Sequence, residues 1–322
     1  MAVIKSRLIS ALVITAVVAS TMVGCAQKQP VTATPEKADA TTEATKESET
    51  SAKLTNLQWS IQPKLGIIKG DYYKIEERFR QGHLGTLEVI KNKDEIMHVE
   101  FNERTRPNYY HRYYQDVPKR MSEYNFTMGE KKGAAWIQSV ISVEKQMLEK
   151  QSITGEFDSV SGASNSIKQS MIPLAEKLAA SLEKPSKEKY YSIAEKLDGG
   201  LTGVLKVVIS DEKIVSVKYD EIFADSPDEI TDPALKKYYR QSKYESVEYE
   251  EPSRLGFNVQ MDELNKKVVE TQNMLDLSEM PAIGDTGNYA ASGYTTRNTA
   301  WDNYLRLAEK LLQEMKNDGN LK

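Results

Sequence analysis

The chain of 322 residues contains an internal repeat, and this repeat restricts the fold more than any other feature of the sequence. Leu174–Leu178 reads Leu-Ala-Glu-Lys-Leu, and Leu307–Leu311 reads the same five residues. Each copy follows a small turn of the form Ser-Gly-x-Ser/Thr, at Ser161–Ser164 in the first case and Ser292–Thr295 in the second. We therefore expect two structural units built to the same plan.

A second match lies upstream, where Gly85–Val89 recurs as Gly203–Val207. Apolar residues such as Leu87 and Val89 alternate with other residues in both segments, which is the period of a half-buried strand. A turn and a second strand follow in each unit. The predicted turns and second strands are Asn92–Asp94 with Ile96–Phe101, and Ser210–Glu212 with Ile214–Tyr219.

Each unit continues with helical patterns. Amphipathic spacing predicts helices over Ala134–Lys150 and Met261–Leu277, each after a tyrosine-rich, helix-compatible stretch around Tyr113–Tyr114 or Tyr238–Tyr239. Proline and charge accumulate at Ser181–Lys187, where the first unit ends. We predict an α+β fold with two tandem domains, each a small, mostly antiparallel sheet packed with helices.

The first 24 residues form a secretory signal. Their apolar run, Leu8–Val23, is shorter than the roughly 20 residues that cross a bilayer. Met22–Cys25 resembles a bacterial lipobox, which implies export and a lipid anchor at Cys25 on the outer face of the cell membrane. Cys25 is the only cysteine, so we expect no disulfide within the chain.

The residues after the signal, 25–56, are mostly small, polar or charged and include no aromatic residue. Such a composition predicts a disordered tether, because it buries too little apolar area to offset the entropy of ordering. The two domains then occupy residues 57–185 and 186–318. The net charge of −4 provides no basic surface, so we expect no nucleic-acid partner.

The hydroxyl turn of the first unit is suited to an anion. Residues Ser161–Ala163 are small, and the helix that follows Ser164 offers unpaired N–H groups to a phosphate. The alternative is that Ser161, Ser164 or Ser166 only caps this helix, which typically stabilises a helix by about 1 kcal/mol.

Two other kinds of site are poorly supported. A serine nucleophile needs an adjacent base, and Ser164 is not in a Gly-x-Ser-x-Gly elbow. The histidines, His83, His98 and His111, have no counterparts in the second unit, so we expect surface or strand residues there rather than a base. No paired His or Cys spacing of the zinc type occurs, and we predict no metal site.

The residues Asp158, Ser161, Gly162, Ala163 and Ser164 resemble the flavinylation motif of FMN-binding domains. With the lipobox and the duplication, the chain is similar to tandem FMN-binding lipoproteins of Gram-positive bacteria, of the extracellular electron-transfer and peptide-pheromone type. The resemblance covers both units. It implies that a membrane flavin transferase uses FAD to attach FMN to Ser164 through a phosphoester bond.

The second copy matches this motif only at Ser292, Gly293 and Thr295. Tyr289 stands where the motif has Asp, and a second tyrosine stands where it has Ala. The resemblance implies a second FMN on Thr295. Thr296 is an equally good acceptor, because the spacing to the following helix is longer here.

The resemblance also implies an electron carrier rather than a substrate-specific enzyme. Electrons would pass from a membrane quinol pool, fed by an NADH dehydrogenase, to extracellular acceptors such as ferric iron, and the cleaved leader would yield a peptide pheromone. The alternative is a ligand-binding or adhesive surface lipoprotein without flavin. Candidates for stacking on the flavin are Tyr109, Tyr110, Tyr113, Tyr114, Tyr238, Tyr239 and Trp136.

Overall fold

The computed structural model describes residues 59–133, 135–159, 163–249, 256–278, 280 and 299–321. All of these residues belong to one compact unit, which spans Thr45–Lys322. Several predicted features lie outside the described residues, namely the signal, the tether up to residue 56, Cys25, Ser161, Gly162, Ser292, Gly293, Thr295 and Thr296. Within the part of the chain that is described, no helix is both long enough and apolar enough to cross a membrane.

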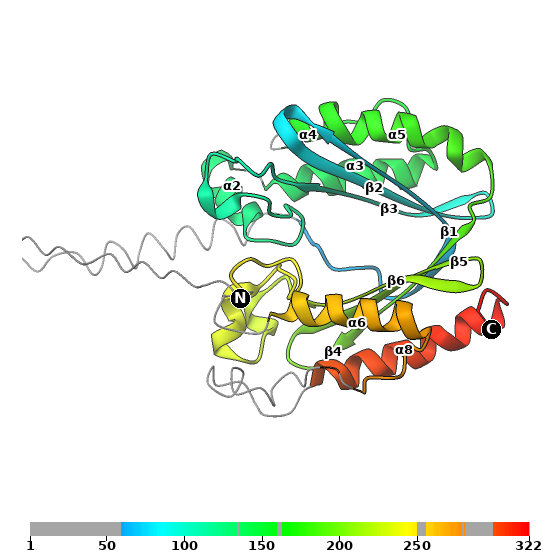
Figure 1. Ribbon diagram of the computed structural model, residues 1–322. Coiled ribbons are helices and arrows are strands. Elements are labelled where there is room, and N and C mark those ends of the chain that lie inside the picture. The colour runs from blue at the N-terminus through cyan, green and yellow to red at the C-terminus, as the bar shows by residue number, and fades with distance from the viewer. Residues whose placement is uncertain are drawn as a thin grey trace, which may run out of the picture. The chain divides into compact units, whose positions relative to one another are not determined.

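One six-stranded sheet organises the fold, in the order β3-β2-β1-β4-β5-β6 (Figure 1). The strands are β1 (Gly66–Phe79), β2 (His83–Asn92), β3 (Glu95–Arg104), β4 (Glu188–Leu197), β5 (Leu201–Ser210) and β6 (Lys213–Phe223). All neighbouring strands are antiparallel, and β1 pairs with β4, with Gly66 opposite Ala194. The predicted α+β class is confirmed, but the two separate small sheets that we predicted are one continuous sheet, because β1 pairs with β4.

We call β1–β3 with their helices the first half and β4–β6 with theirs the second half. The first half contains α2 (Tyr124–Lys132), α3 (Trp136–Lys150), α4 (Ser164–Ser166), a π-helical turn (Ile167–Met171) and α5 (Ile172–Ala179). The second half contains α6 (Phe257–Thr271) and α8 (Thr299–Asn317). Short 3-10 turns include Arg80–Gly82, Arg112–Tyr114, Ala180–Glu183 and Pro233–Tyr238. In Figure 1, α3 and α5 lie beside β1–β3, and α6 and α8 lie beside β4–β6.

Most of the predicted elements are confirmed. The two hairpins occur where expected, and both copies of Leu-Ala-Glu-Lys-Leu are helical, in α5 and α8. The helix predicted over Met261–Leu277 is shifted, because α6 begins at Phe257 and ends before Gln272, which adopts a left-handed conformation (φ 58°). The predicted boundary at Ser181–Lys187 is a connection, in which a 3-10 turn leads into β4.

Each half buries one face of its strands against its own helices. The first core combines Leu87, Val89, Val99 and Phe101 with Val140, Val143 and Met147 of α3. The second combines Leu205, Val207, Val217 and Tyr219 with α6 and α8. The opposite face of the sheet carries a small third cluster, in which Tyr72 stacks on Tyr190 with ring centroids 5.6 Å apart. Strand alternation therefore places residues such as Glu100 and Lys206 on the face away from the helices.

The repeat in sequence is also a repeat in contacts. Gln151 directly follows α3 and has a left-handed conformation (φ 51°). Its Oε1 accepts from the Ile96 N–H (2.8 Å), and its Nε2 donates to the Ile96 carbonyl (3.2 Å). Gln272, after α6, makes the same pair of bonds to Ile214, at 2.8 and 2.9 Å. These bonds satisfy backbone groups on the edge strands β3 and β6, each of which has a neighbouring strand on one side only.

Candidate functional site

A cavity of about 350 Å³ lies around the start of the helix that carries the predicted flavin-bearing serine. Ala163 and Ser164 both line it, together with residues from the β1–β2 hairpin tip, the end of β3 and the start of α3. Ser164 is exposed, whereas Ala163 is buried. The two described residues of the hydroxyl turn therefore line a cavity.

The helix begins in a way that leaves Ser164 out of the capping position. Ala163 is the N-cap residue and has no side-chain acceptor, so Ser164 and Ser166 lie within the first turn. The hydroxyl of Ser166 is buried and accepts a hydrogen bond from Trp136 Nε1 (3.0 Å). No side-chain cap hydrogen bond is made at the start of α4 or at Ser166, which precedes the π-helical turn, and Ser161 is outside the described residues.

Gly85 allows this helix to lie directly on β2. A Cβ atom at Gly85 would overlap the Ser170 hydroxyl, so glycine permits this approach without movement of the Ser170 side chain. Ser170 belongs to the π-helical turn Ile167–Met171, a type of distortion that is frequent at functional sites.

A buried ionic group forms one wall of the cavity. The Glu103 carboxylate is 2% exposed, pairs with Lys119 and lies 3.0 Å from His83 Nδ1. Burial alone would raise the pKa of Glu103, but His83 and Lys119 outweigh it and lower the pKa. Burial lowers the pKa of Lys119, although Glu103 opposes that shift. The Lys119 ammonium also lies 4.9 Å from the Tyr124 ring centre and 5.6 Å from that of Trp136.

Aromatic rings form a second wall. The rings of Tyr109 and Tyr110 are 4.4 Å apart, and the Tyr109 hydroxyl lies 3.2 Å from the Tyr124 hydroxyl. Burial raises the pKa of Tyr109 to about 12, so this hydroxyl is neutral at physiological pH. Of the predicted stacking residues, Tyr109, Tyr110 and Trp136 line the cavity, whereas Tyr113, Tyr114, Tyr238 and Tyr239 are not among its lining residues.

The hairpin tip between β1 and β2 contributes a cation. Arg80 (φ 33°) and Gln81 (φ 64°) both have left-handed conformations, which cost an L-residue roughly 1–2 kcal/mol each. The corresponding tip of the second half has Gly199 and Gly200 in this region. Gln81 is thus strained where the second half has Gly199, whereas Arg80 corresponds to Asp198. Arg80 lines the cavity.

The lining of the cavity is cationic overall. Arg80, Arg106 and Lys119 are present with a single carboxylate, Glu103. Among the cavity-lining atoms, Arg106 Nε and Glu103 Oε2 are buried without a hydrogen-bond partner in the protein. Such a surface suits a ligand with a flat ring and a negatively charged phosphate.

Asp158, the first residue of the predicted motif, is exposed and does not line this cavity. Its backbone is held by α3, because the Asp158 N–H donates to Gln146 Oε1 (2.8 Å) and Gln146 Nε2 donates to the Asp158 carbonyl (2.8 Å). These bonds fix the backbone at Asp158.

The second half contains a matching ionic group. Glu221 is buried, pairs with Lys243 and accepts from the Tyr219 hydroxyl (2.8 Å) and from Asn303 Nδ2 (3.2 Å). The Lys243 ammonium lies 5.8 Å from the Phe257 ring centre, as Lys119 lies near Trp136. The hydroxyl turn of this half lies outside the described residues.

Sequence reasoning missed several of these residues. Glu103, Lys119, Arg80, Arg106 and Tyr124 were not predicted as site residues. His83, expected on a surface or strand, begins β2 but is buried and lines the cavity. One signal was available, since Glu103 and Lys119 have sequence counterparts in Glu221 and Lys243.

Comparisons with known proteins add little. No protein-family model matches the chain, and no curated protein matches it. The chain is similar to a solved structure, the CPE2226 protein from Clostridium perfringens, at 24% identity over 36% of this chain and 90% of that one, with a TM-score of 0.29. No group of three or more His, Cys, Asp or Glu within the described ranges could hold a metal ion.

Proposed function

We propose that this chain is an extracellular flavoprotein, anchored to the bacterial cell membrane through Cys25, that carries FMN on Ser164. The observation that supports this proposal is the position of Ser164 beside a cavity with aromatic and cationic walls. Its volume, about 350 Å³, falls within the roughly 300–1,000 Å³ typical of small-molecule sites. In this proposal each half corresponds to one domain of the FMN-binding type.

The residues present fit FMN. Tyr109, Tyr110 and Trp136 offer ring faces to the isoalloxazine, while Arg80 and Arg106 offer charge to a phosphate. FMN supplies the redox chemistry, and the protein positions the ring and tunes its electrostatic environment. The buried Glu103–Lys119 pair holds one wall rigid beneath the aromatic residues.

Attachment requires access to Ser164 from outside. Its exposed side chain satisfies that requirement. In the proposed reaction the Ser164 oxygen bonds to the FMN phosphorus of FAD, AMP leaves, and the hydroxyl proton passes to a base of the flavin transferase. The covalent bond then prevents loss of the flavin by dilution outside the cell.

The wider role rests on the sequence resemblance. Electrons would come from a membrane quinol pool fed by an NADH dehydrogenase and pass to extracellular acceptors such as ferric iron. A second FMN would be attached at Thr295 or Thr296, and the cleaved leader would yield a peptide pheromone.

The test is intact-mass measurement of natively processed, delipidated protein from a host that contains the transferase. We expect the mass of one or two FMN phosphoesters, with flavin fluorescence that stays with the band in a denaturing gel. Ser164→Ala should remove one FMN, and Ser159→Ala, at a neighbouring exposed serine, should remove none. Thr295→Ala and Thr296→Ala identify the second acceptor. Unmodified side chains at all three positions would overturn the proposal and favour a flavin-free binding or adhesive lipoprotein.

A further inference from the structure

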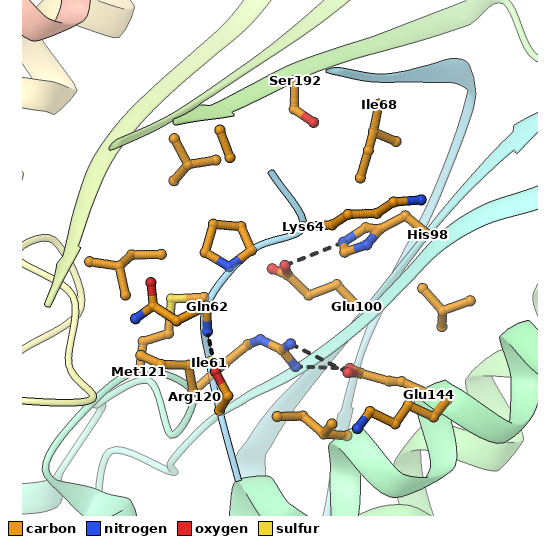
Figure 2. A pocket seen from close by; sticks show the side chains of 18 of the residues that line it. Ile61, Gln62, Lys64, Ile68, His98, Glu100, Arg120, Met121, Glu144 and Ser192 are labelled. Carbon is orange, nitrogen blue, oxygen red and sulfur yellow. Dashed lines mark hydrogen bonds and ion pairs between the residues drawn. The ribbon is translucent and has the colours of Figure 1, made fainter. Parts of the chain in front are cut away.

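A second, larger cavity of about 850 Å³ lies between the sheet, the segment before β1 and helix α3 (Figure 2). Its walls come from both halves. They include Ile68 and Glu100 of the first half, Tyr190 and Lys206 of the second, and the segment Trp59–Lys64, which precedes β1. This cavity has no lining residue in common with the one around Ser164.

The wall formed by Trp59–Lys64 is held in place by the second half. Gln62 Nε2 donates to the Phe223 carbonyl (2.7 Å), and Gln62 Oε1 accepts from the Thr202 hydroxyl (2.6 Å). The Trp59 ring centre lies 4.7 Å from Arg240 Cζ. This wall of the cavity is therefore fixed by contacts with the folded second half.

Both carboxylates of this cavity are already paired. Glu100 Oε2 lies 3.0 Å from Lys206 Nζ and 3.5 Å from His98 Nε2. Glu144 Oε1 lies 2.8 Å from Arg120 Nη1, as Figure 2 shows. These pairs neutralise the buried charges, so the remaining charge of the cavity comes from other residues.

Two lysines supply that charge. Lys64 and Lys145 line the cavity and are exposed. None of the ion pairs between described residues includes either lysine. The accessible part of the cavity is therefore positively charged, while its interior includes the apolar side chains of Ile61, Ile141 and Leu148.

The interior also has polar atoms without a protein partner. Arg120 is 7% exposed, and its Nε atom has no hydrogen-bond partner in the protein. The same holds for Trp59 Nε1 and Gln138 Oε1, which belong to two further lining residues. These atoms are fully buried, so we assign recognition of a ligand to the accessible lysines and not to these atoms.

We propose that this cavity binds a small organic anion with an apolar body, such as an aryl or acyl carboxylate. The apolar body packs against Ile61, Ile141 and Leu148, and the carboxylate is attracted to Lys64 and Lys145. This binding activity is separate from the flavin site and does not depend on it.

The test is isothermal titration calorimetry of the natively processed, delipidated protein with three probes. Naphthalene-2-carboxylate and decanoate distinguish aryl from acyl bodies, and naphthalene-2-carboxamide is the neutral control. We expect one carboxylate per chain, bound at least about tenfold more tightly than the amide, with the difference reduced at high salt. Absence of binding by both carboxylates, or equal affinity for the carboxylate and the amide, would overturn the proposal.

Variants locate the site. Lys64→Gln combined with Lys145→Gln should weaken carboxylate binding about five- to tenfold without affecting the fold, since both residues are exposed. Ser142→Trp places a large ring at the half-buried lining position on α3 and should abolish binding. Lys168→Gln, at an exposed lysine that does not line the cavity, is the matched control. Unchanged affinity in both the double variant and Ser142→Trp would place the anion elsewhere and refute the assignment.

Discussion

Asn102 on β3 and Asp220 on β6 make the same hydrogen bonds in the two halves, one with a neutral side chain and the other with an acid. Asn102 Oδ1 accepts from the N–H groups of Glu103 (2.8 Å) and Arg120 (3.1 Å). Asp220 Oδ1 accepts from Glu221 (2.8 Å) and Tyr244 (3.1 Å). Burial raises the pKa of Asp220 to about 7, although Lys218 opposes the shift.

This difference predicts that Asp220→Asn raises the free energy of unfolding by an amount that depends on pH. The folded-state pKa of Asp220 lies above the unfolded value of 3.8, so between about pH 4 and pH 7 the folded state binds more protons. The free energy of unfolding therefore falls as pH rises through this window, and the loss is complete above about pH 7. Asparagine keeps the acceptor without the charge. We expect Asp220→Asn to be more stable than the parent by about 2–4 kcal/mol at pH 8, with a smaller gain at pH 5, in urea denaturation.

The control uses the equivalent position in the first half. Asn102→Asp introduces an acid where the native residue is an amide. It should therefore lower the free energy of unfolding more at pH 8 than at pH 5. Stability changes that are the same at both pH values would show that Asp220 does not titrate in this range.

A second prediction concerns the contact of Gly85 with Ser170. Gly85→Ala should lower the free energy of unfolding by about 1–3 kcal/mol, because the new methyl group overlaps Ser170 Oγ. Ser170→Ala should be close to neutral, since the hydroxyl is buried and has no hydrogen-bond partner in the protein. In the Ser170→Ala background, Gly85→Ala should lower the free energy of unfolding by less than it does in the parent protein. Chemical denaturation of the four proteins gives the coupling energy.

Gly203 provides the comparison for this cycle. It occupies the Gly85 position in the second half, but a methyl group there would meet Leu197 and Leu307. Gly203→Ala should therefore lose stability to the same extent with or without Ser170→Ala. Equal coupling for both glycines would contradict the steric explanation.

A third prediction concerns Glu123, which connects the halves. Its carboxylate accepts from the Ser246 hydroxyl (2.6 Å) and from the N–H groups of Val247 (3.1 Å) and Glu248 (2.6 Å). Glu123→Ala should lower the free energy of unfolding by about 2–4 kcal/mol, because these bonds involve a charged acceptor. Hydrogen exchange of the Val247 amide should accelerate more than that of Ile96, which Gln151 protects within the first half. Glu130→Ala, at an exposed glutamate on α2, should leave both rates unchanged.

Local patterns predicted much of the fold but not the strands that join its halves. Strands β2, β3, β5 and β6 lie where alternation placed them, whereas β1 and β4 were not predicted. Ile193–Leu197 in β4 reads Ile-Ala-Glu-Lys-Leu, which differs by one residue from the helical Leu174–Leu178. In β4 the pairing of Ile193 with Ile67 on one side and Leu205 on the other outweighs the helical preference of the segment.

The candidate site was only partly predictable for a related reason. The motif singled out Ala163 and Ser164, which are adjacent in sequence and line the same cavity. Glu103, Lys119 and Arg80 come from three separate parts of the chain, and only the fold brings them to that cavity. Comparison of the two halves could have indicated Glu103 and Lys119, but not Arg80, because the acidic Asp198 stands at the corresponding position of the second half.

The final prediction tests Arg80 within the proposed flavin site. Reduction adds negative charge to a bound flavin, so a nearby cation favours the reduced form and raises the midpoint potential. Arg80 is exposed, which limits its effect to about 0.5–1 kcal/mol. For a two-electron couple this corresponds to a potential lower by about 10–20 mV in Arg80→Gln, measured by redox titration of flavin absorbance.

Two features distinguish this effect from a general loss of charge. Arg112→Gln removes an exposed arginine that does not line the cavity and should leave the potential unchanged. The shift in Arg80→Gln should also shrink at high salt, because the charge is accessible to screening ions. An equal shift in both variants would assign the effect to net charge and would argue against a position for Arg80 beside the flavin. A shift confined to Arg80→Gln would give the strained arginine a role that Asp198, at the corresponding position of the second half, lacks.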